Sequence, residues 1–468
     1  MVTQSAAAPP AAPAQSSGKL LAALIVGGVA AILDTTIIAI GLQTLTRQLH
    51  ASVATIQWVS TGYLLALAVA IPFVSWSQAR FGGKRVWLFA LTLFVVGSIL
   101  CACAWDAPSL IAFRVVQGLG GGIMFPLMQT LAMQNVAPEN RTRTMAAVAI
   151  PAALGPILGP VLGGLVLEWL DWRWLFLINV PLGIVGLVLA TMFIVDDRPL
   201  PGGPRPRLDS VGVVLLAPAL AGLLYGLSDA HAEGGFGRTD VLVPGIAGAL
   251  LLVGFTVWAV RGGGAALVDV RLLAVRSVRS SSIALTFLGA ALFAGTFLLP
   301  LYFQISRGDG VLDAALLLIP QGVGSLLARL FASPIVGRFG ARTVAAAGFV
   351  LSAIATVPFA LAGAGTSLWP LGAALFVRGL CLGVVMIPVM TTAYVDIDRQ
   401  EMPHASAITR IVQQLGGAFG TALVAVVLTA AATASDAAAG FGPAFWTVIV
   451  MSAVAAAASL LLPGRTRS

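Results

Sequence analysis

The sequence has few charged residues. Asp, Glu, Lys and Arg make up 9% of its 468 residues and hydrophobic residues 59%, whereas a soluble domain carries about 25% charge. This composition excludes a soluble globular protein and indicates an all-α membrane protein. The net charge of +8 does not indicate nucleic-acid binding, because the basic residues stand singly or in twos and threes between apolar segments.

Cysteine is also scarce. Cys101, Cys103 and Cys381 all fall within apolar segments, and their spacing is not that of metal ligands. We interpret them as packing residues and expect no disulfide framework and no metal site. The sequence also lacks the phosphate-binding pattern GxxxxGK[ST]. No cofactor and no nucleotide are therefore expected, and the sequence does not predict an enzyme.

Long apolar segments, by contrast, follow one another along the chain. A segment of about 18 or more such residues is long enough to cross a bilayer as a helix. The sequence predicts fourteen of them: 20–45, 56–78, 86–105, 109–132, 144–168, 174–195, 210–229, 241–260, 280–304, 313–336, 343–363, 367–392, 405–431 and 441–462.

The basic residues are distributed unevenly between the loops. With a cytoplasmic N-terminus, Arg47, Arg173, Arg238 and Arg307 alone fall in loops on the outer side, and most of the 26 Lys and Arg fall inside. Because cytoplasmic loops carry the excess of Lys and Arg, both termini are predicted to be cytoplasmic. The protein is expected to be a multi-pass protein of the cell inner (plasma) membrane.

Two short patterns each occur twice, eight segments apart. Arg80-Phe81-Gly82-Gly83-Lys84-Arg85 follows the second segment, and Arg338-Phe339-Gly340-Ala341-Arg342 follows the tenth. The fourth segment carries Gly118-Leu119-Gly120-Gly121-Gly122, and the twelfth carries Gly379-Leu380-Cys381-Leu382-Gly383. Internal repeats around a midplane site are typical of secondary transporters.

The repeats predict two six-helix halves separated by an inserted pair of helices. The predicted division is a disordered cytoplasmic tail at 1–18, an N-terminal half at 19–197, a linker with two extra helices at 198–276, a C-terminal half at 277–462 and a tail at 463–468.

Asp34 is the one acidic residue in the middle of an apolar segment. It lies about 21 Å along the helix from Leu20, well inside a hydrocarbon core of about 30 Å. A carboxylate at this depth costs several kcal/mol unless it is paired, hydrated or protonated, which makes it a candidate functional group. Asp34 therefore indicates proton-coupled transport.

The fifth segment combines glycine and proline at regular intervals. Glycine at every fourth position gives one smooth helix face that a neighbouring helix can approach closely. The prolines remove backbone donors and are expected to bend the helix. The residues of this pattern are Gly155, Pro156, Gly159, Pro160, Gly163 and Gly164.

In these segments the chain resembles the major facilitator superfamily, and within it the fourteen-span drug:proton antiporter family of the EmrB/QacA type. Antiporters of that superfamily carry Gly-Pro-x-x-Gly-Gly in the fifth span. The resemblance covers residues 20–462 in order. The other matching segments are Leu33–Thr36, Arg114–Gly118, Trp172–Pro181, Leu299–Gln304 and Gln414–Gly420.

The resemblance implies a major facilitator fold that works by alternating access and exports small amphipathic drugs or antibiotics in exchange for protons. Such a multidrug efflux protein would act in antibiotic resistance. It also implies that Asp34 and Arg114 take part in proton coupling. A low dielectric favours the neutral acid and a nearby guanidinium favours the ion, so a proton or a cationic substrate could shift the balance. Alternatively, Arg114 is structural and bonds to carbonyls of neighbouring spans.

The loop after the second span departs from the superfamily pattern Gly-x-x-x-Asp-Arg-x-Gly-x-Lys/Arg. Ser75 stands at the glycine position and Ala79 at the aspartate position, so the aspartate that the family uses at its cytoplasmic gate is missing. The remaining candidate gate residues are Arg80, Gly82, Lys84, Arg85, Arg338, Gly340 and Arg342. Their basic side chains also serve as a topology signal.

Drug-binding cavities combine aromatic walls with a few polar groups. The candidate cavity residues are Gln57, Trp58, Tyr63, Gln117, Gln304 and Arg378. Arg329 and Arg378 either line the cavity and favour anionic or zwitterionic substrates, or bond to carbonyls and cytoplasmic acids. For Arg329 the structural role is favoured, and Arg410 is interpreted as a boundary residue.

The expected partners are a small-molecule substrate and the lipid bilayer, and a monomer is expected. A dedicated exporter of a single metabolite on the same fold is an alternative. A membrane sensor or enzyme scaffold would need a soluble domain, and the longest predicted loop is 261–279.

Overall fold

The computed structural model describes residues 17–134, 136–197, 207–229, 238–262, 266–363, 365–431 and 437–463. Every regular element in these ranges is a helix, as expected for an all-α protein. Most of the predicted tails at 1–18 and 463–468 lies outside the described ranges.

The first half of the molecule is a bundle of helices with one 3-10 turn. Its elements are α1 (Ser17–Gln48), α2 (Val53–Ala70), α3 (Phe73–Phe81), α4 (Gly83–Ala102), α5 (Ala107–Gln134), η1 (Pro138–Asn140), α6 (Arg141–Val148), α7 (Ile150–Trp169), α8 (Trp174–Leu177) and α9 (Asn179–Phe193).

The second half is built in the same way. Its elements are α12 (Arg276–Leu301), the π-helical turn η4 (Tyr302–Ser306), α13 (Val311–Leu317), α14 (Ile319–Phe339), α15 (Ala341–Ala360), α16 (Leu368–Thr392), α17 (Met402–Ala431), η5 (Ala437–Gly440) and α18 (Phe441–Ser459).

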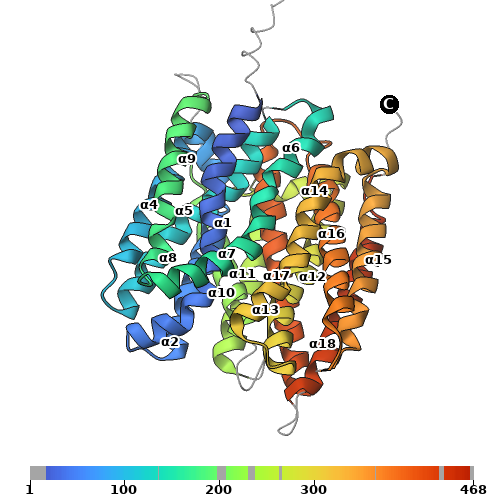
Figure 1. Cartoon of the computed structure of the whole chain (residues 1–468). Helices are drawn as coiled ribbons and strands as arrows, with labels where there is room; N and C mark the ends of the chain where they lie inside the picture. The colour runs from blue at the N-terminus through green and yellow to red at the C-terminus, as the bar shows by residue number, and fades with distance from the viewer. Residues whose placement is uncertain are drawn as a thin grey trace, which may run out of the picture.

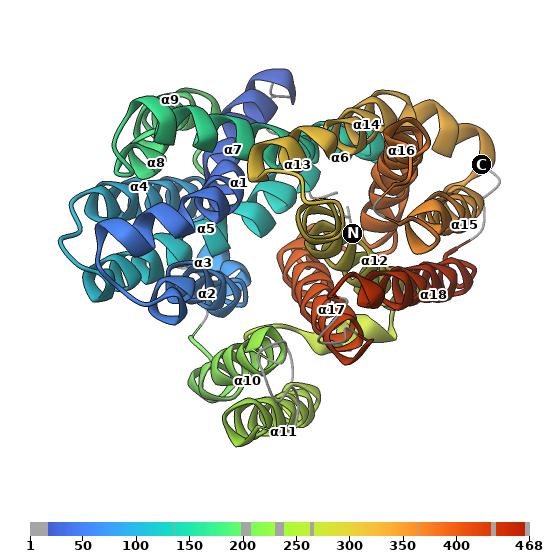
Figure 2. The ribbon, with the colours of Figure 1, turned by 60° about the horizontal axis from the view of Figure 1, so that its bottom comes forward.

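An extra pair of helices lies beside the two halves, as Figure 2 shows. The pair is α10 (Ser210–Asp229) and α11 (Thr239–Arg261), and η3 (Val270–Ala274) leads from it into α12. Helix α10 packs against α2 of the first half and α17 of the second. The inserted pair therefore borders the interface between the halves without separating them.

The described residues contain twelve helices that are long and apolar enough to cross a membrane, and thirteen if α2 and α3 count as one bent span. The predicted span at 144–168 is not among these helices. It corresponds to α6 and α7, and several side chains of α7 lie outside the described part. Each of the fourteen predicted segments coincides with one helix or a consecutive helix pair. The number fourteen itself stays a prediction.

The second predicted span is broken rather than continuous. Pro72 stands between α2 and α3, whose axes differ by 55°. Proline cannot donate a backbone hydrogen bond and its ring clashes with the preceding turn, which accounts for the break.

The repeated loops adopt the same backbone conformation in both halves. Gly82 and Gly340 have φ of 83° and 82°, a region that side chains other than glycine rarely adopt. Each glycine ends one helix and begins the next. The sequence repeat thus corresponds to a structural repeat.

Helix α1 begins and α18 ends on the same side of the molecule, the top in Figure 1. We call this the terminal side and the other the opposite side. The two glycine loops lie on the terminal side, so α3 and α14 end there and α4 and α15 begin there.

Candidate functional site

Asp34 is completely buried in the first half. Its Oδ2 atom accepts a hydrogen bond from Nη1 of Arg114 at 2.5 Å, and the two side chains form an ion pair. Its Oδ1 atom accepts from Gln117 Nε2 at 2.9 Å and from Asn179 Nδ2 at 2.8 Å. The carboxylate therefore receives hydrogen bonds from α5 and α9, and both of its oxygens are satisfied.

The donors around Asp34 are themselves held in place. Gln117 Oε1 accepts from Arg114 Nη1 at 2.7 Å, and Gln117 Nε2 also donates to Ser98 Oγ at 2.7 Å. Arg114 Nε donates to the carbonyl oxygen of Val59 at 3.1 Å. Arg114 thus pairs with Asp34 and also donates a hydrogen bond to the carbonyl of a neighbouring span, so the contacts expected from both interpretations occur together. Such a connected buried network fixes the position of its charged members.

Tyr63 forms one wall of this network. The centre of the Arg114 guanidinium lies 4.0 Å from the centroid of the Tyr63 ring, a geometry in which the aromatic face attracts the cation. The hydroxyl of Tyr63 donates to the carbonyl oxygen of Ala31 on α1 at 3.5 Å. Tyr63 thus contacts both the guanidinium and the helix that carries Asp34.

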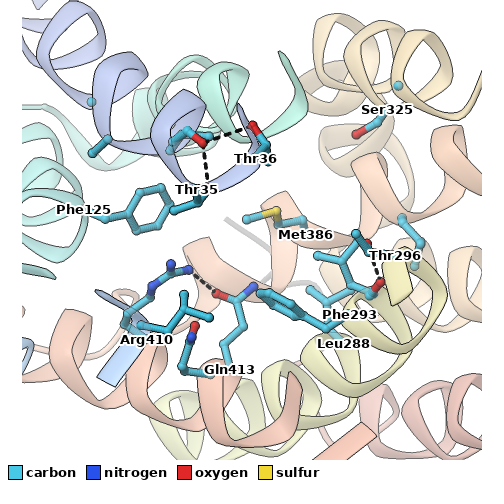
Figure 3. A pocket seen from close by; sticks show the side chains of 18 of the residues that line it. Thr35, Thr36, Phe125, Leu288, Phe293, Thr296, Ser325, Met386, Arg410 and Gln413 are labelled. Carbon is cyan, nitrogen blue, oxygen red and sulfur yellow. Dashed lines mark hydrogen bonds between the residues drawn. The ribbon is translucent and has the colours of Figure 1, made fainter. Parts of the chain in front are cut away.

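A cavity of about 290 Å³ lies between the two halves. Figure 3 shows Thr35 and Thr36 of α1 on one side of it and Arg410 and Gln413 of α17 on the other. The lining is mostly apolar, as in many sites for small molecules. The polar lining residues are Thr35, Thr36, Tyr63, Thr296, Gln321, Ser325, Arg329, Arg410, Gln413 and Gln414.

Tyr63 lines the cavity, whereas Asp34 and Arg114 do not. The neighbours of Asp34 on α1, Ile32 and Thr35, do reach it. The acid therefore lies behind the cavity wall, with Tyr63 between the ion pair and the cavity.

Of the candidate cavity residues, Tyr63 lines the cavity and most of the others lie elsewhere. Gln117 is buried in the Asp34 network, and Trp58 stacks on Tyr225 of α10 with 5.6 Å between ring centroids. Gln304 lies in η4 and is not among the lining residues. The side chain of Gln57 lies outside the part of the chain that the structure describes.

The buried arginines also differ from expectation. Arg378 was a cavity candidate with a structural role as the alternative. It is not among the described lining residues, and it donates to Gln321 Oε1 at 3.1 Å and to the carbonyl oxygen of Ala291 at 3.0 Å, as the structural alternative expects. Arg329 and Arg410, which were interpreted as structural and boundary residues, do line it. Arg410 lies within α17, which begins at Met402, and so about 12 Å from its start.

The glycine face of α7 packs against α1. A Cβ atom on Gly155 or Gly159 would collide with Ile32 or Thr36 of α1. The hydroxyl of Thr36 donates to the carbonyl oxygen of Gly155 at 3.0 Å, which such close approach permits. The side chains of Pro156 and Pro160 lie outside the described part, and the expected bend is not tested.

We expect Gly159→Leu to slow transport strongly and to lower the melting temperature. A Cβ at this position would lie 2.6 Å from Thr36 Cβ and 3.1 Å from the backbone nitrogen of Ile37, so α1 and α7 must move apart. Overpacking of this kind costs about 1–3 kcal/mol. Transport rates and thermal unfolding of the purified protein provide the measurement.

Gly372→Leu serves as the matched control for this crowding. Gly372 also lies in a membrane helix, α16, but a Cβ there would have no atom within 4 Å. Wild-type transport in both variants would contradict the importance of the α1–α7 contact.

The halves are joined by hydrogen bonds on the terminal side. Thr130 Oγ1 and Ser406 Oγ lie 2.7 Å apart, and Gln134 Nε2 donates to the carbonyl oxygen of Arg399 at 3.0 Å. Arg141 Nη1 donates to the carbonyl oxygen of Tyr394 at 2.5 Å. These contacts join the halves on the terminal side without an acid at position 79.

The glycine loops act within their own halves. The carboxylate of Asp197, after α9, accepts from the backbone nitrogens of Gly83 and Lys84 at 2.9 and 3.1 Å, and a negative charge stabilises a helix N-terminus. In the second half Arg342 Nε donates to the carbonyl oxygen of Leu462 at 2.7 Å. In each half the helix that follows the glycine loop is thus bonded to the chain just after the last helix of that half: α4 to the residues after α9, and α15 to the residues after α18.

The other gate residues are placed at the same loops. Lys84 Nζ donates to the carbonyl oxygen of Thr191 at 2.8 Å, and Arg338 lies 5.4 Å from the ring centroid of Phe339. Arg85 is exposed and Arg80 is partly exposed. None of these described contacts crosses between the halves.

Sequence reasoning missed Ser98, Asn179 and Asp197. Asn179 is a polar residue at the start of an apolar span, so its residue type could have indicated it. Gln117 follows Arg114 by three positions, which places both on one helix face and could have predicted their shared role. Within the described residues, no three His, Cys, Asp or Glu side chains gather to hold a metal ion.

Comparison with known proteins gives relatives along most of the chain. A protein of Mycobacterium tuberculosis named "Multidrug resistance protein B homolog" is 34% identical over 86% of this chain and 75% of its own length. A "Putative multidrug resistance protein MdtD" of Serratia proteamaculans is 31% identical over 85% of this chain and 82% of its own.

Solved structures share the fold at low identity. The human organic anion transporter MFSD10 superposes with a TM-score of 0.67 at 14% identity, covering 95% of this chain and 99% of its own. The proton:xylose symporter XylE superposes with a TM-score of 0.65 at 15% identity, covering 94% of each chain. The family model described as "Major Facilitator Superfamily" matches residues 24–421 of this chain. The chain therefore belongs to the major facilitator superfamily of membrane transporters.

Proposed function

We propose that this transporter exports small amphipathic compounds from the cytoplasm in exchange for protons, with its terminal side in the cytoplasm. The observation that carries the proposal is Asp34, a buried carboxylate paired with Arg114 directly behind the wall of the cavity between the halves. The relatives named for multidrug resistance support the substrate class.

A proton and a substrate would act on the same arginine. The ionised Asp34 accepts the hydrogen bond of Arg114, and a proton on the carboxyl removes the charge that holds the guanidinium there. The other face of the guanidinium rests on Tyr63, whose ring lines the cavity. A compound that binds against Tyr63 therefore changes the contact between its ring and Arg114. Protonation of Asp34 weakens the ion pair that holds Arg114, and so changes the same contact from the other side.

We infer an outward-facing state in this orientation, because hydrogen bonds join the halves on the terminal side. The contacts of Thr130 with Ser406 and of Arg141 with Tyr394 would have to break before the cavity opens to the cytoplasm. Rigid-body rocking of the halves would accomplish this. A cycle of protonation at Asp34 and substrate binding in the cavity would then alternate between the two states.

Transport by the full chain in proteoliposomes tests the proposal. We expect an acidic lumen in an alkaline bath to drive accumulation of an amphipathic probe, because protons leaving the lumen exchange for probe entering it. Ethidium and 1-pyrenesulfonate serve as probes, since their fixed charges prevent passive trapping by pH. Accumulation driven instead by an acidic bath would indicate symport. No accumulation of a probe that is shown to bind, under either gradient, would overturn the proposal.

A further inference from the structure

The charged residues that line the cavity are all positive. Arg329 and Arg410 border it, and no Asp or Glu is among its described lining residues. We propose that these two arginines form an anion subsite, so that the cavity selects amphipathic compounds with a carboxylate, sulfonate or phosphate head. The inference rests on the proposed function and names its substrate class.

Arg329 is a buried cation without a charged partner among the described residues. It is 6% exposed. Its Nη2 atom lies 3.9 Å from the sulfur of Met386, a weak acceptor, and its Nε and Nη1 atoms have no hydrogen-bond partner. A guanidinium buried in this way is costly unless a counter-charge or acceptor reaches it.

Arg410 is only partly satisfied. Its Nη1 atom donates to Gln413 Oε1 at 3.1 Å, whereas its Nε atom has no partner. The guanidinium lies 4.4 Å from the ring centroid of Phe125, and Figure 3 shows the two side chains together at the cavity. The aromatic face holds the cation in position and leaves hydrogen-bonding capacity for a ligand.

Each arginine is the lining residue of its helix that lies nearest the terminal side. From Leu318, which precedes α14, the lining residues Gln321, Ser325 and Arg329 follow this helix from the opposite side inward. Gln321 and Arg329 are about 12 Å apart along the helix. Arg410 is the lining residue of α17 nearest its terminal-side start. Both therefore lie in the terminal-side part of the cavity lining, towards the side on which hydrogen bonds join the halves.

The other buried arginines already have acceptors. Arg114 pairs with Asp34, so this pair adds no net charge beside the cavity. Arg378 donates to Gln321 and to a backbone carbonyl. Guanidinium groups with unused donors thus remain in the cavity lining at Arg329 and Arg410, where an anion would gain charge-assisted hydrogen bonds and a cation would meet two like charges. The apolar walls from α12, including Leu288 and Phe293, would hold the hydrophobic body.

The test compares compounds that share one hydrophobic body and differ in charge. The probes are 1-pyrenesulfonate, 1-pyrenesulfonamide and (1-pyrenylmethyl)trimethylammonium, titrated onto the purified full-length protein. We expect the sulfonate to bind at least about tenfold more tightly than either other probe, as hydrogen bonds to a charged group are worth about 1.5–3 kcal/mol. Equal or tighter binding of the ammonium probe would overturn the proposal.

Substitution then assigns the subsite. In Arg329→Gln and Arg410→Gln the sulfonate should bind at least about tenfold more weakly, with binding of the sulfonamide little changed. Arg329→Lys should recover part of the loss. Arg261→Gln is the matched control, because Arg261 is exposed at the end of α11. Unchanged sulfonate binding in both cavity variants would remove these residues from the subsite.

A thermal measurement guards against misfolding. Since Arg329 has unsatisfied buried donors, Arg329→Gln should melt no lower than the wild type. The sulfonate should raise the melting temperatures of the wild type and of Arg261→Gln more than those of Arg329→Gln and Arg410→Gln. Binding is measured without a pH gradient, so failure of proton-driven transport with intact sulfonate selectivity would reject the proposed function alone. Proton-driven transport of ethidium but not of the sulfonate would reject the anion subsite alone.

Discussion

We expect Asp34→Asn to abolish proton-driven transport and to leave substrate exchange in place. The amide cannot take up and release a proton, so a pH gradient has no group on which to act at this position. The cavity does not include Asp34 among its lining residues, so the compound still binds. Transport under an acidic lumen should fall to the rate of protein-free vesicles, whereas exchange of labelled for unlabelled probe without a gradient should continue.

The stability of this variant needs its own measurement. Removing one partner of a buried ion pair costs about 3–5 kcal/mol when the other charge is left uncompensated, and Arg114 keeps Gln117 and Val59 as acceptors. Asp171→Asn is the control, because Asp171 forms an exposed pair with Arg173, and such pairs contribute little. Proton-driven transport at the wild-type rate in Asp34→Asn would show that another group carries the proton.

The spans and the Asp34–Arg114 pair could be predicted because each depends on a strong local signal. The hydrocarbon core requires long apolar helices, so composition alone locates them. A charge inside such a helix is costly, so a carboxylate there can be recognised from the sequence as a candidate functional group that needs a compensating partner. Arg114 was then selected among the arginines within the spans by the resemblance to the antiporter family, and the structure shows the two side chains paired.

The lining of the cavity could not be predicted, since it depends on how helices are rotated and tilted against one another. Trp58 has the residue type of a drug-site aromatic, yet α10 packs against α2 and provides Tyr225 as its partner. Arg410 lies close to a span boundary in the sequence, but α17 carries it to the cavity. Residue type and depth are local properties, whereas the direction of a helix face is set by its neighbours.

The closure of the terminal side was also beyond sequence reasoning. The missing aspartate at position 79 indicated that another contact was needed, but nothing near it in the sequence identified one. Thr130 and Ser406 are ordinary small polar residues 276 positions apart. Their importance arises only because the halves meet there, which makes them the place to test whether the halves separate.

A disulfide between Thr130→Cys and Ser406→Cys should stop transport, and reduction should restore it. The two hydroxyl oxygens lie 2.7 Å apart, close enough for sulfurs at the same positions to bond with small side-chain adjustments. The link joins α5 to α17 across the halves. If access alternates by rocking, the linked protein stays closed on the terminal side and cannot collect substrate there.

The experiment is carried out in a Cys103→Ser background, because Cys103 is exposed whereas Cys101 and Cys381 are buried. The oxidised double variant should transport at the rate of protein-free vesicles, and each single-cysteine variant should be unaffected by the oxidant. The linked protein should still bind 1-pyrenesulfonate from the opposite side, because the cavity is formed in the closed state. Undiminished transport by fully linked protein would mean that the halves do not separate at this contact, and substrate would have to reach the cavity by another route.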